Sequence, residues 1–313
     1  MRPSSLRDSG VSGSKAKLFY PRPKTGGFLK LRAYAKLNLY LDVVGKRPDG
    51  YHDIVSVMQT IDLFDELEIF LTGKKKGFRF KTTSNDVPSD ESNLVAKAAK
   101  LMINEYKISE SFEINLTKRI PVGAGLAGGS ADGAAAIKGI NELLKINAKV
   151  DELMGIAASL GADVPFCLMG GTCLAQGIGE ILTPLAPHPD CLIVVAFPGV
   201  HVSTGDIFGK LSFEANKLSA EKKEKILSSF RNNELTEMAF SLYNVFTDLT
   251  SKKYPIVEKL ISLLKIGGAI GASMTGTGSA VFGYFSNEPA AKKTMLNLDG
   301  FAKTYLVKPI NRG

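Results

Sequence analysis

The segment of residues 121–131, which reads PVGAGLAGGSA, constrains the fold more than any other part of the chain. Four glycines and three alanines in eleven residues leave few side chains to keep a ligand away from the backbone. Strand-like residues 112–116 precede the segment and a helical pattern over residues 131–144 follows it. Successive N–H groups and a helix N-terminus together favour phosphate binding. On glycine content alone, a tight turn without a ligand stays open. No Gly-Lys-Ser/Thr follows, so this is not a Walker A loop.

The composition predicts a globular protein of two domains. The chain has 313 residues, of which 44% are hydrophobic and 22% charged, a balance typical of such proteins. Its longest apolar stretches have the length of strands, so no membrane partner is expected. Residues 1–27 hold six basic side chains and one acidic one, leaving 33 basic against 30 acidic residues in the rest. The net charge of +8 therefore belongs mostly to this segment, and no nucleic-acid partner is expected.

Cysteine and histidine usage bears on location and on metals. The three cysteines form no Cys-x-x-Cys pair, which favours a reducing compartment and a bacterial cytoplasmic location. The three histidines are scattered, so a histidine-rich metal site is not expected. Residues 1–27 lack the apolar core of a signal peptide and are interpreted as a flexible basic tail. A transit segment, with a plastid location, or an upstream start codon are the alternatives.

Hydrophobic patterning predicts a mixture of α-helices and β-strands. Ser92 and Asp151 are expected to cap the helices at residues 93–106 and 151–160. Prolines 184, 187 and 189 suggest a boundary between an N-terminal domain, residues 28–185, and a C-terminal domain, residues 186–313. The other predicted elements are strands at residues 28–44, 54–71, 112–116, 172–174, 192–197, 280–285 and 304–308, and helices within 131–144, 213–264 and 289–298.

Three ordered segments resemble the motifs of the GHMP kinases, a superfamily of small-molecule kinases. They are residues 33–39 (AYAKLNL), 121–131 and 271–280 (GASMTGTGSA). The resemblance implies an α+β fold of two domains with the active site in the cleft between them. The first would be similar to domain 2 of ribosomal protein S5 and the second would be ferredoxin-like. It also implies ATP as co-substrate, with a second loop flanking the phosphates through Thr275, Gly276 and Gly278.

Within this superfamily the chain is most similar to the kinases that act on 4-diphosphocytidyl-2-C-methyl-D-erythritol. Residues 46–52 (KRPDGYH), 161–166 (GADVPF) and 177–180 (GIGE) carry that similarity. The resemblance implies transfer of the ATP γ-phosphoryl group to the 2-hydroxyl of this cytidine diphosphate-linked methylerythritol, in the non-mevalonate isoprenoid pathway. It also implies that the glycine-rich loop binds ATP through Pro121, Val122, Gly123, Ala124, Gly125, Leu126, Ala127, Gly128, Gly129, Ser130 and Ala131.

Lys36 and Asp163 are the candidate catalytic residues. Lys36 lies in an otherwise apolar strand, so its ammonium group needs a partner. Asp163 lies between Gly-Ala and Val-Pro-Phe, an apolar setting for a carboxylate. The resemblance, and not the spacing, places the two together, with Asp163 as the base. Alternatively, Asp163 is a helix cap, and Lys36 extends from an edge strand into solvent.

Five residues are candidates for substrate binding. Asn38 shares a strand face with Lys36 and can hydrogen-bond near the reacting hydroxyl. The resemblance implies that Tyr51 stacks on the cytosine and that His52 binds its edge, with Thr204 and Phe208 on the opposite wall. Stacking and edge recognition suit a nucleobase, although Phe208 is equally expected in the core. Asn93 matches the strip beside the adenine, with helix capping as the alternative.

The loop departs from the family pattern at two positions. Ala127 stands where relatives usually have glycine, and Ala131 where many have serine. Both side chains are small, so the backbone should still reach the phosphates. No protein ligand is assigned to Mg²⁺, which is expected to bind chiefly through ATP oxygens and water.

Two other functions remain as alternatives. Another kinase of the superfamily would act on mevalonate, homoserine or a sugar, but these substrates offer no base to Tyr51 and His52. A non-catalytic nucleotide- or RNA-binding protein would fit an S5-like fold and the basic tail, but it has no use for a Lys36–Asp163 pair. The chain is expected to be a monomer or a weak homodimer.

Overall fold

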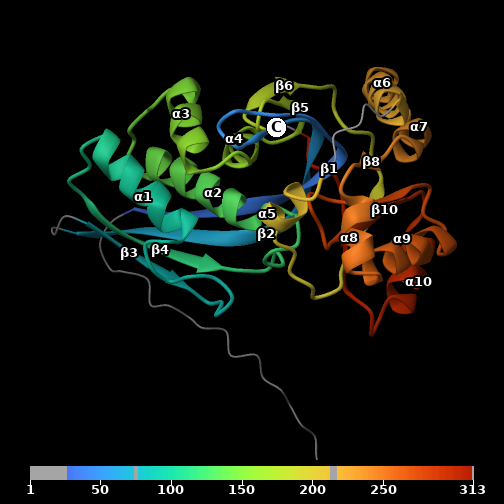
Figure 1. The fold of residues 1–313 in the computed structure, drawn as a ribbon. Coiled ribbons are helices and arrows are strands. Elements are labelled where there is room, and N and C mark those ends of the chain that lie inside the picture. Colours follow the sequence, from blue (N-terminus) through green and yellow to red (C-terminus); the bar gives the residue numbers. More distant parts are fainter. Residues whose placement is uncertain (1–26, 74–76, 212–216, 312–313) are drawn as a thin grey trace, which may run out of the picture.

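The computed structural model describes residues 27–73, 77–211 and 217–311, arranged as two lobes (Figure 1). Apart from Gly27, the predicted basic tail lies outside the described residues. A seven-stranded sheet dominates the first lobe and a four-stranded sheet the second. In the described ranges, no helix is long and apolar enough to cross a membrane.

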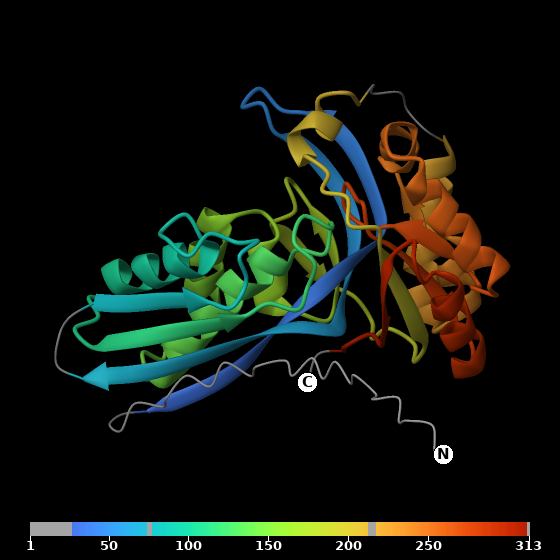
Figure 2. The same ribbon diagram turned by 90° about the horizontal axis from the view of Figure 1, so that it is seen from below.

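Two long antiparallel strands form the centre of the first lobe. β1 and β2 pair along almost their whole length and extend from the first lobe toward the second (Figure 2). Their neighbours give the order β3-β4-β2-β1-β8, and β5 joins β2 farther along and carries β6 at its outer edge. The bounds are Phe28–Lys46 for β1, His52–Gly73 for β2, Gly77–Thr82 for β3, Ser111–Thr117 for β4, Thr172–Gln176 for β5, Ile181–Pro184 for β6 and Tyr243–Asn244 for β8.

Four helices cover one face of this sheet (Figure 1). The central one is α2, whose small residues allow close packing on the strands. A Cβ atom at Gly139 would lie 2.5 Å from Ile69 Cδ1 and 2.7 Å from Leu31 Cδ1, so glycine is what lets α2 approach β1 and β2. The bounds are Leu94–Glu105 for α1, Gly128–Leu143 for α2, Val150–Leu160 for α3 and Val164–Met169 for α4.

The second lobe is built on a sheet of order β11-β7-β10-β9. β7 and β10 are apolar and buried in the middle of this sheet, and α8, α9 and α10 lie together in this lobe (Figure 1). The bounds are Leu192–Phe197 for β7, Thr204–Phe208 for α5, Lys217–Asn232 for α6, Leu235–Phe240 for α7, Thr247–Lys253 for α8, Ile256–Ile266 for α9, Ala272–Met274 for β9, Val281–Phe285 for β10, Glu288–Asn297 for α10 and Lys303–Val307 for β11.

The two lobes share strands and core. The sheets divide between β6 and β7, near the predicted boundary, but β8 from the second half pairs with β1 in the first lobe. Near the C-terminus, Pro309 bridges to Ile61, and Ile310 N–H donates to the Thr60 carbonyl at 2.8 Å. One hydrophobic cluster contains residues of both sheets, Leu37 and Phe282 among them.

Three predicted helix boundaries are wrong. The glycine-rich segment enters α2 already at Gly128, because three residues expected in the loop adopt helical geometry. Asn93, and not Ser92, caps α1, since its side chain accepts from Val95 N–H at 2.9 Å. α3 begins one residue before Asp151, which lies in its first turn and still favours the positive end of the helix dipole.

His188 is a buried polar residue between the core and the C-terminal segment. Its Nδ1 lies 2.7 Å from the Pro189 carbonyl, which can only accept, so Nδ1 carries the proton. Nε2 then accepts from the Tyr284 hydroxyl at 2.8 Å. Burial disfavours the charged imidazolium and lowers the pKa of His188 to about 4.

This histidine should make the fold sensitive to mild acid. Because the unfolded pKa is about 6.5, the stabilisation is complete above that pH and is lost as the pH falls toward 4. From pH 7 to pH 5 we expect the free energy of unfolding to drop by about 2 kcal/mol through this group. Urea titrations of the wild type and His188→Gln at both pH values measure it. The free energy of unfolding of the variant should fall by about 2 kcal/mol less than that of the wild type. Equal losses in the two proteins would contradict a low pKa for His188.

Candidate active site

An irregularity in β1 positions Lys36 and Asn38. The pairing of β1 with β2 shifts register between Tyr34 and Lys36, and again between Asn38 and Tyr40. Such irregularities re-aim side chains and release backbone groups from the ladder. Lys36 N–H thus donates to the Leu126 carbonyl at 3.1 Å. Lys36 is buried, so the alternative in which it extends from an edge strand into solvent is wrong.

Three consecutive carbonyls of the glycine-rich loop are bound by protein donors. Ala124 O accepts from Ala280 N–H at 3.1 Å, Gly125 O from the Thr275 hydroxyl at 3.3 Å, and Leu126 O from β1. Within the described part of the chain, the N–H groups of residues 123–127 donate to no protein acceptor. Since the segment also lines a cavity, these amides and the N-terminus of α2 form a surface suited to an anion.

The second small-residue loop packs backbone to backbone on the first. A Cβ atom at Gly125, where φ is +81°, would lie 2.2 Å from the Thr275 carbonyl oxygen. Asn38 joins the second loop to Lys36, because its Oδ1 accepts from Gly276 N–H at 3.0 Å and from Lys36 Nζ at 2.6 Å. Its Nδ2 donates to the Ser56 hydroxyl at 2.8 Å. Asn38 therefore fixes the side chain of Lys36 relative to the second loop, and the backbone N–H of Lys36 binds the first.

Lys36 and Asp163 lie together, as predicted. Lys36 Nζ is 3.8 Å from Asp163 Oδ2, and the side chains are 5% and 36% exposed. Asp163 occupies the residue before α4, but its side chain makes no capping hydrogen bond, so the alternative of a helix cap is not what the structure shows. The carboxylate is thus held near an ammonium group while one side remains open to the cavity.

One cavity of about 800 Å³ is lined by both the glycine-rich loop and the Lys36–Asp163 pair. Among the described residues that line it there are three lysines, Lys36, Lys46 and Lys118, and one carboxylate, Asp163. Lys36 is paired with Asp163, and Lys118 with the buried carboxylates of Asp65 and Asp132. Lys46 is the lining lysine whose charge no carboxylate of the described residues balances, and it can attract an anionic ligand. No group of three or more His, Cys, Asp or Glu side chains that could hold a metal ion is found in the described ranges.

Aromatic side chains form the far end of the cavity. The His52 and Phe208 rings lie with centroids 5.2 Å apart, and Phe208 packs on Phe246 at 4.5 Å. Tyr51 is 60% exposed and lines the same cavity. Phe208 is thus half in the core and half in the cavity, beside Thr204, whose hydroxyl lies 3.2 Å from that of Thr277.

Four predicted site residues do not line this cavity. Asn93 caps α1 and donates from Nδ2 to the Pro88 carbonyl at 2.9 Å, while its neighbour Leu94 faces the cavity. Ala131 is buried inside α2. From the second loop, Gly276 and Thr277 reach the cavity, and Thr275 and Gly278 instead hold the loops in place.

Lys118 and Lys46 were missed as cavity residues, although both stand beside segments with a predicted role. A basic residue directly between a strand and the glycine-rich loop was the available signal for Lys118.

The departure from the family pattern at Ala127 has a local conformational cost. This residue caps α2 in the left-handed conformation, with φ of 54°, which favours glycine by about 1 kcal/mol.

Two family models match the chain, one in each lobe. The model of the GHMP kinases N terminal domain matches residues 93–171, and the GHMP kinases C terminal model matches residues 226–300. A crystal structure of 4-(cytidine 5'-diphospho)-2C-methyl-D-erythritol kinase superposes with a TM-score of 0.77 at 30% identity, covering 91% of this chain and 100% of that one. The chain belongs to the GHMP kinase family, and the predicted two-domain fold is confirmed.

Its relatives narrow the comparison further. The chain is 42% identical over 265 residues to 4-diphosphocytidyl-2-C-methyl-D-erythritol kinase from Lachnoclostridium phytofermentans, covering 85% of this chain and 90% of the relative. It is also 42% identical over 282 residues to the kinase of that name from Exiguobacterium sibiricum, covering 89% and 96%. Homoserine kinase from Cytophaga hutchinsonii shares the fold, with a TM-score of 0.75 at 22% identity.

Gly125→Ala tests the contact between the two loops. The new methyl group would overlap the Thr275 carbonyl in a conformation that alanine rarely adopts. We expect affinity for an ATP analogue, measured by calorimetry, to fall at least about tenfold. Gly155→Ala is the matched control, since nothing lies within 4 Å of that position in α3. It should leave ATP affinity unchanged and stabilise the fold by about 1 kcal/mol. Equal ATP affinity of both variants would contradict the expectation.

Proposed function

We propose that this chain transfers the γ-phosphoryl group of ATP to the 2-hydroxyl of 4-diphosphocytidyl-2-C-methyl-D-erythritol. The observation that supports this best is the single cavity shared by the free loop amides, the Lys36–Asp163 pair and the aromatic wall. The names of the relatives point to the same reaction. The product would serve the non-mevalonate isoprenoid pathway.

ATP would place its phosphates on the N–H groups of residues 123–127 and the start of α2. Leu94 and Val87 line the same cavity and offer apolar contact for the adenine. ATP would carry Mg²⁺ mainly on its own oxygens and water, because Asp163 is the one carboxylate among the described residues that line the cavity. The ion would supply charge neutralisation for the transferring group.

Asp163 would accept the proton of the substrate hydroxyl as its oxygen attacks the γ-phosphorus and ADP leaves. Lys36, 3.8 Å from this carboxylate, would stabilise negative charge on the transferring group. Asn38 holds Lys36 Nζ by a buried hydrogen bond of 2.6 Å. Because phosphoryl transfer depends mainly on positioning and electrostatics, such a restrained pair is well suited to it.

The aromatic wall would bind the cytosine. Tyr51 and Phe208 offer ring faces for stacking, and His52 has a polar ring edge beside them. Lys46, at the end of β1, would lie near the diphosphate of the substrate. This arrangement favours the cytidyl substrate over mevalonate or homoserine, which have no base.

A coupled assay of ADP release tests the proposal directly. The purified chain is supplied with ATP, Mg²⁺ and 4-diphosphocytidyl-2-C-methyl-D-erythritol, and in parallel with mevalonate and with homoserine. We expect turnover with the cytidyl substrate and none with the two controls. Turnover with a control alone would keep the kinase chemistry and refute the cytosine wall. Silence with all three would refute the proposed activity.

Asp163→Asn tests the proposed base. The amide keeps the shape of the side chain but cannot take the proton, so kcat should fall by roughly 10²–10⁴-fold. Affinity for ATP, measured by calorimetry, should change little. Asp151→Asn, on the exposed first turn of α3 and outside the cavity lining, is the control with normal kcat. Full turnover by Asp163→Asn would remove this residue from the mechanism.

A further inference from the structure

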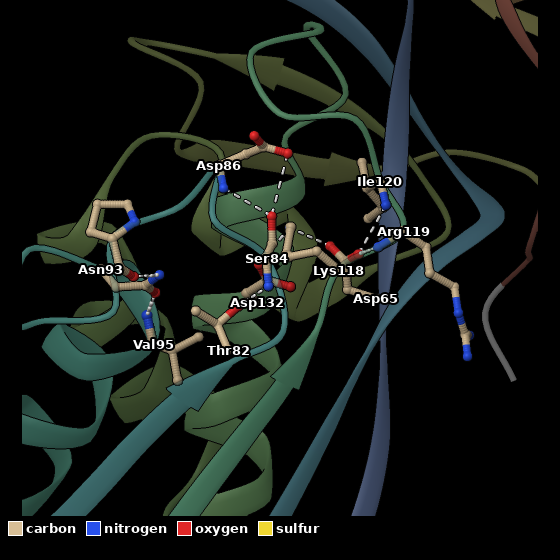
Figure 3. A network of polar contacts seen from close by, with 11 residues as sticks. Asp65, Thr82, Ser84, Asp86, Asn93, Val95, Lys118, Arg119, Ile120 and Asp132 are labelled. Carbon is tan, nitrogen blue, oxygen red and sulfur yellow. Dashed lines mark hydrogen bonds and ion pairs between the residues drawn. The ribbon is translucent and has the colours of Figure 1, made fainter. Parts of the chain in front are cut away.

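Beneath the glycine-rich loop lies a buried ionic cluster of Asp65, Lys118 and Asp132, which we call the loop clamp (Figure 3). The three side chains are 0%, 5% and 3% exposed. They come from β2, from the residue after β4, and from α2. Burying three ionisable groups is costly unless each is paired. Apolar side chains would fill the same space without that cost, so the cluster indicates a role other than packing.

Asp65 holds the strand-side end of the loop. Its Oδ1 accepts from the backbone N–H groups of Arg119 and Ile120, the latter at 2.9 Å. Its Oδ2 accepts from Lys118 Nζ. These donors come from the three residues that immediately precede Pro121, so this one carboxylate fixes the backbone where the loop begins.

Asp132 holds the helix-side end. Lys118 Nζ donates to Asp132 Oδ2 at 2.7 Å and so connects the first turns of α2 to Asp65. A Cβ atom at Gly128 would lie 3.2 Å from the same Nζ, which places the ammonium directly beside the start of α2. The other oxygen, Asp132 Oδ1, is buried without a hydrogen-bond partner in the described residues.

The charges of the clamp are unequal, since two carboxyl groups share one ammonium. Burial raises the pKa of Asp132 well above its ordinary value, against the attraction of Lys118. Burial alone would lower the pKa of Lys118, but attraction to Asp132 and Asp65 outweighs it, so that pKa is raised. A protonated Asp132 would leave Lys118 and Asp65 as a neutral pair.

We propose that Asp65 and Asp132, joined through Lys118, are positioning residues that hold both ends of the ATP-binding loop at the spacing the phosphates require. Their contacts are with Lys118 and the backbone, and the loop amides are what meet the nucleotide. The inference rests on the proposed function for the identity of the ligand. It predicts that the affinity for ATP changes and the affinity for the second substrate does not, because the clamp residues make no contact with the aromatic wall among the described residues.

Three variants of Asp132 test the clamp. Asp132→Asn keeps an oxygen that can accept from Lys118, and it should bind an unhydrolysable ATP analogue within about twofold of the wild type. Asp132→Leu has a similar shape without an acceptor, and it should bind the analogue at least about tenfold more weakly. Asp132→Ala, which also lacks an acceptor and is smaller, decides the matter if the leucine variant does not fold. KM for ATP should rise in parallel while KM for the cytidyl substrate stays unchanged.

Glu113→Gln is the matched control, because it breaks an exposed ion pair with Lys81 on the same sheet, at 2.8 Å. It should leave both constants unchanged. Normal ATP affinity in folded Asp132→Leu or Asp132→Ala would overturn the proposal. An equal rise of both KM values, which indicates general loosening, would overturn it too. Binding of the analogue is measured without the second substrate. Failure of the clamp is therefore distinguishable from failure of the proposed activity.

Discussion

The orientation of the peptide groups in the glycine-rich loop is the constraint on which the rest of the site depends. Each peptide group carries one donor and one acceptor, so N–H groups that stay free for an anion leave the carbonyls of the same segment in need of partners. Here the carbonyls of Ala124, Gly125 and Leu126 are bound by the second loop and by β1. The fold therefore supplies the donors behind the loop, and the glycines let them approach.

The same contacts place the reactive groups. Lys36 N–H binds the loop, while Lys36 Nζ faces Asp163 and Asn38. A shift of the loop would thus move the lysine, and the phosphates and the proposed base keep a fixed separation. Charge follows the same arrangement, since Lys36 faces the carboxylate of Asp163 in the cavity. Position and electrostatics are set by one group of contacts.

The glycine-rich loop and the lysine of the site could be predicted from the sequence, because the types of residue next to each other in the chain indicate them. Small residues at 121–131 and an isolated lysine in an apolar strand carry their meaning in the chain itself. Contacts between distant segments carry no such local signal. Asp65 and Asp132 are unremarkable acidic residues in the sequence, and Asn93 stands equally well as a helix cap or a nucleotide contact. Asp65 and Asp132 come together only because β2 pairs with β4 and α2 packs beside them. The role of Asn93 as a helix cap becomes visible only from the geometry of α1.

The dependence of the loop on Thr275 and Ala280 also has a consequence for the order in which the protein is made. Synthesis proceeds from the N-terminus, so the glycine-rich loop emerges from the ribosome long before the residues that bind its carbonyls. β2 likewise emerges long before Pro309 and Ile310, which contact its residues Ile61 and Thr60. A nascent or prematurely terminated chain therefore lacks a formed nucleotide site. The protein would bind ATP only after nearly the whole chain has left the ribosome.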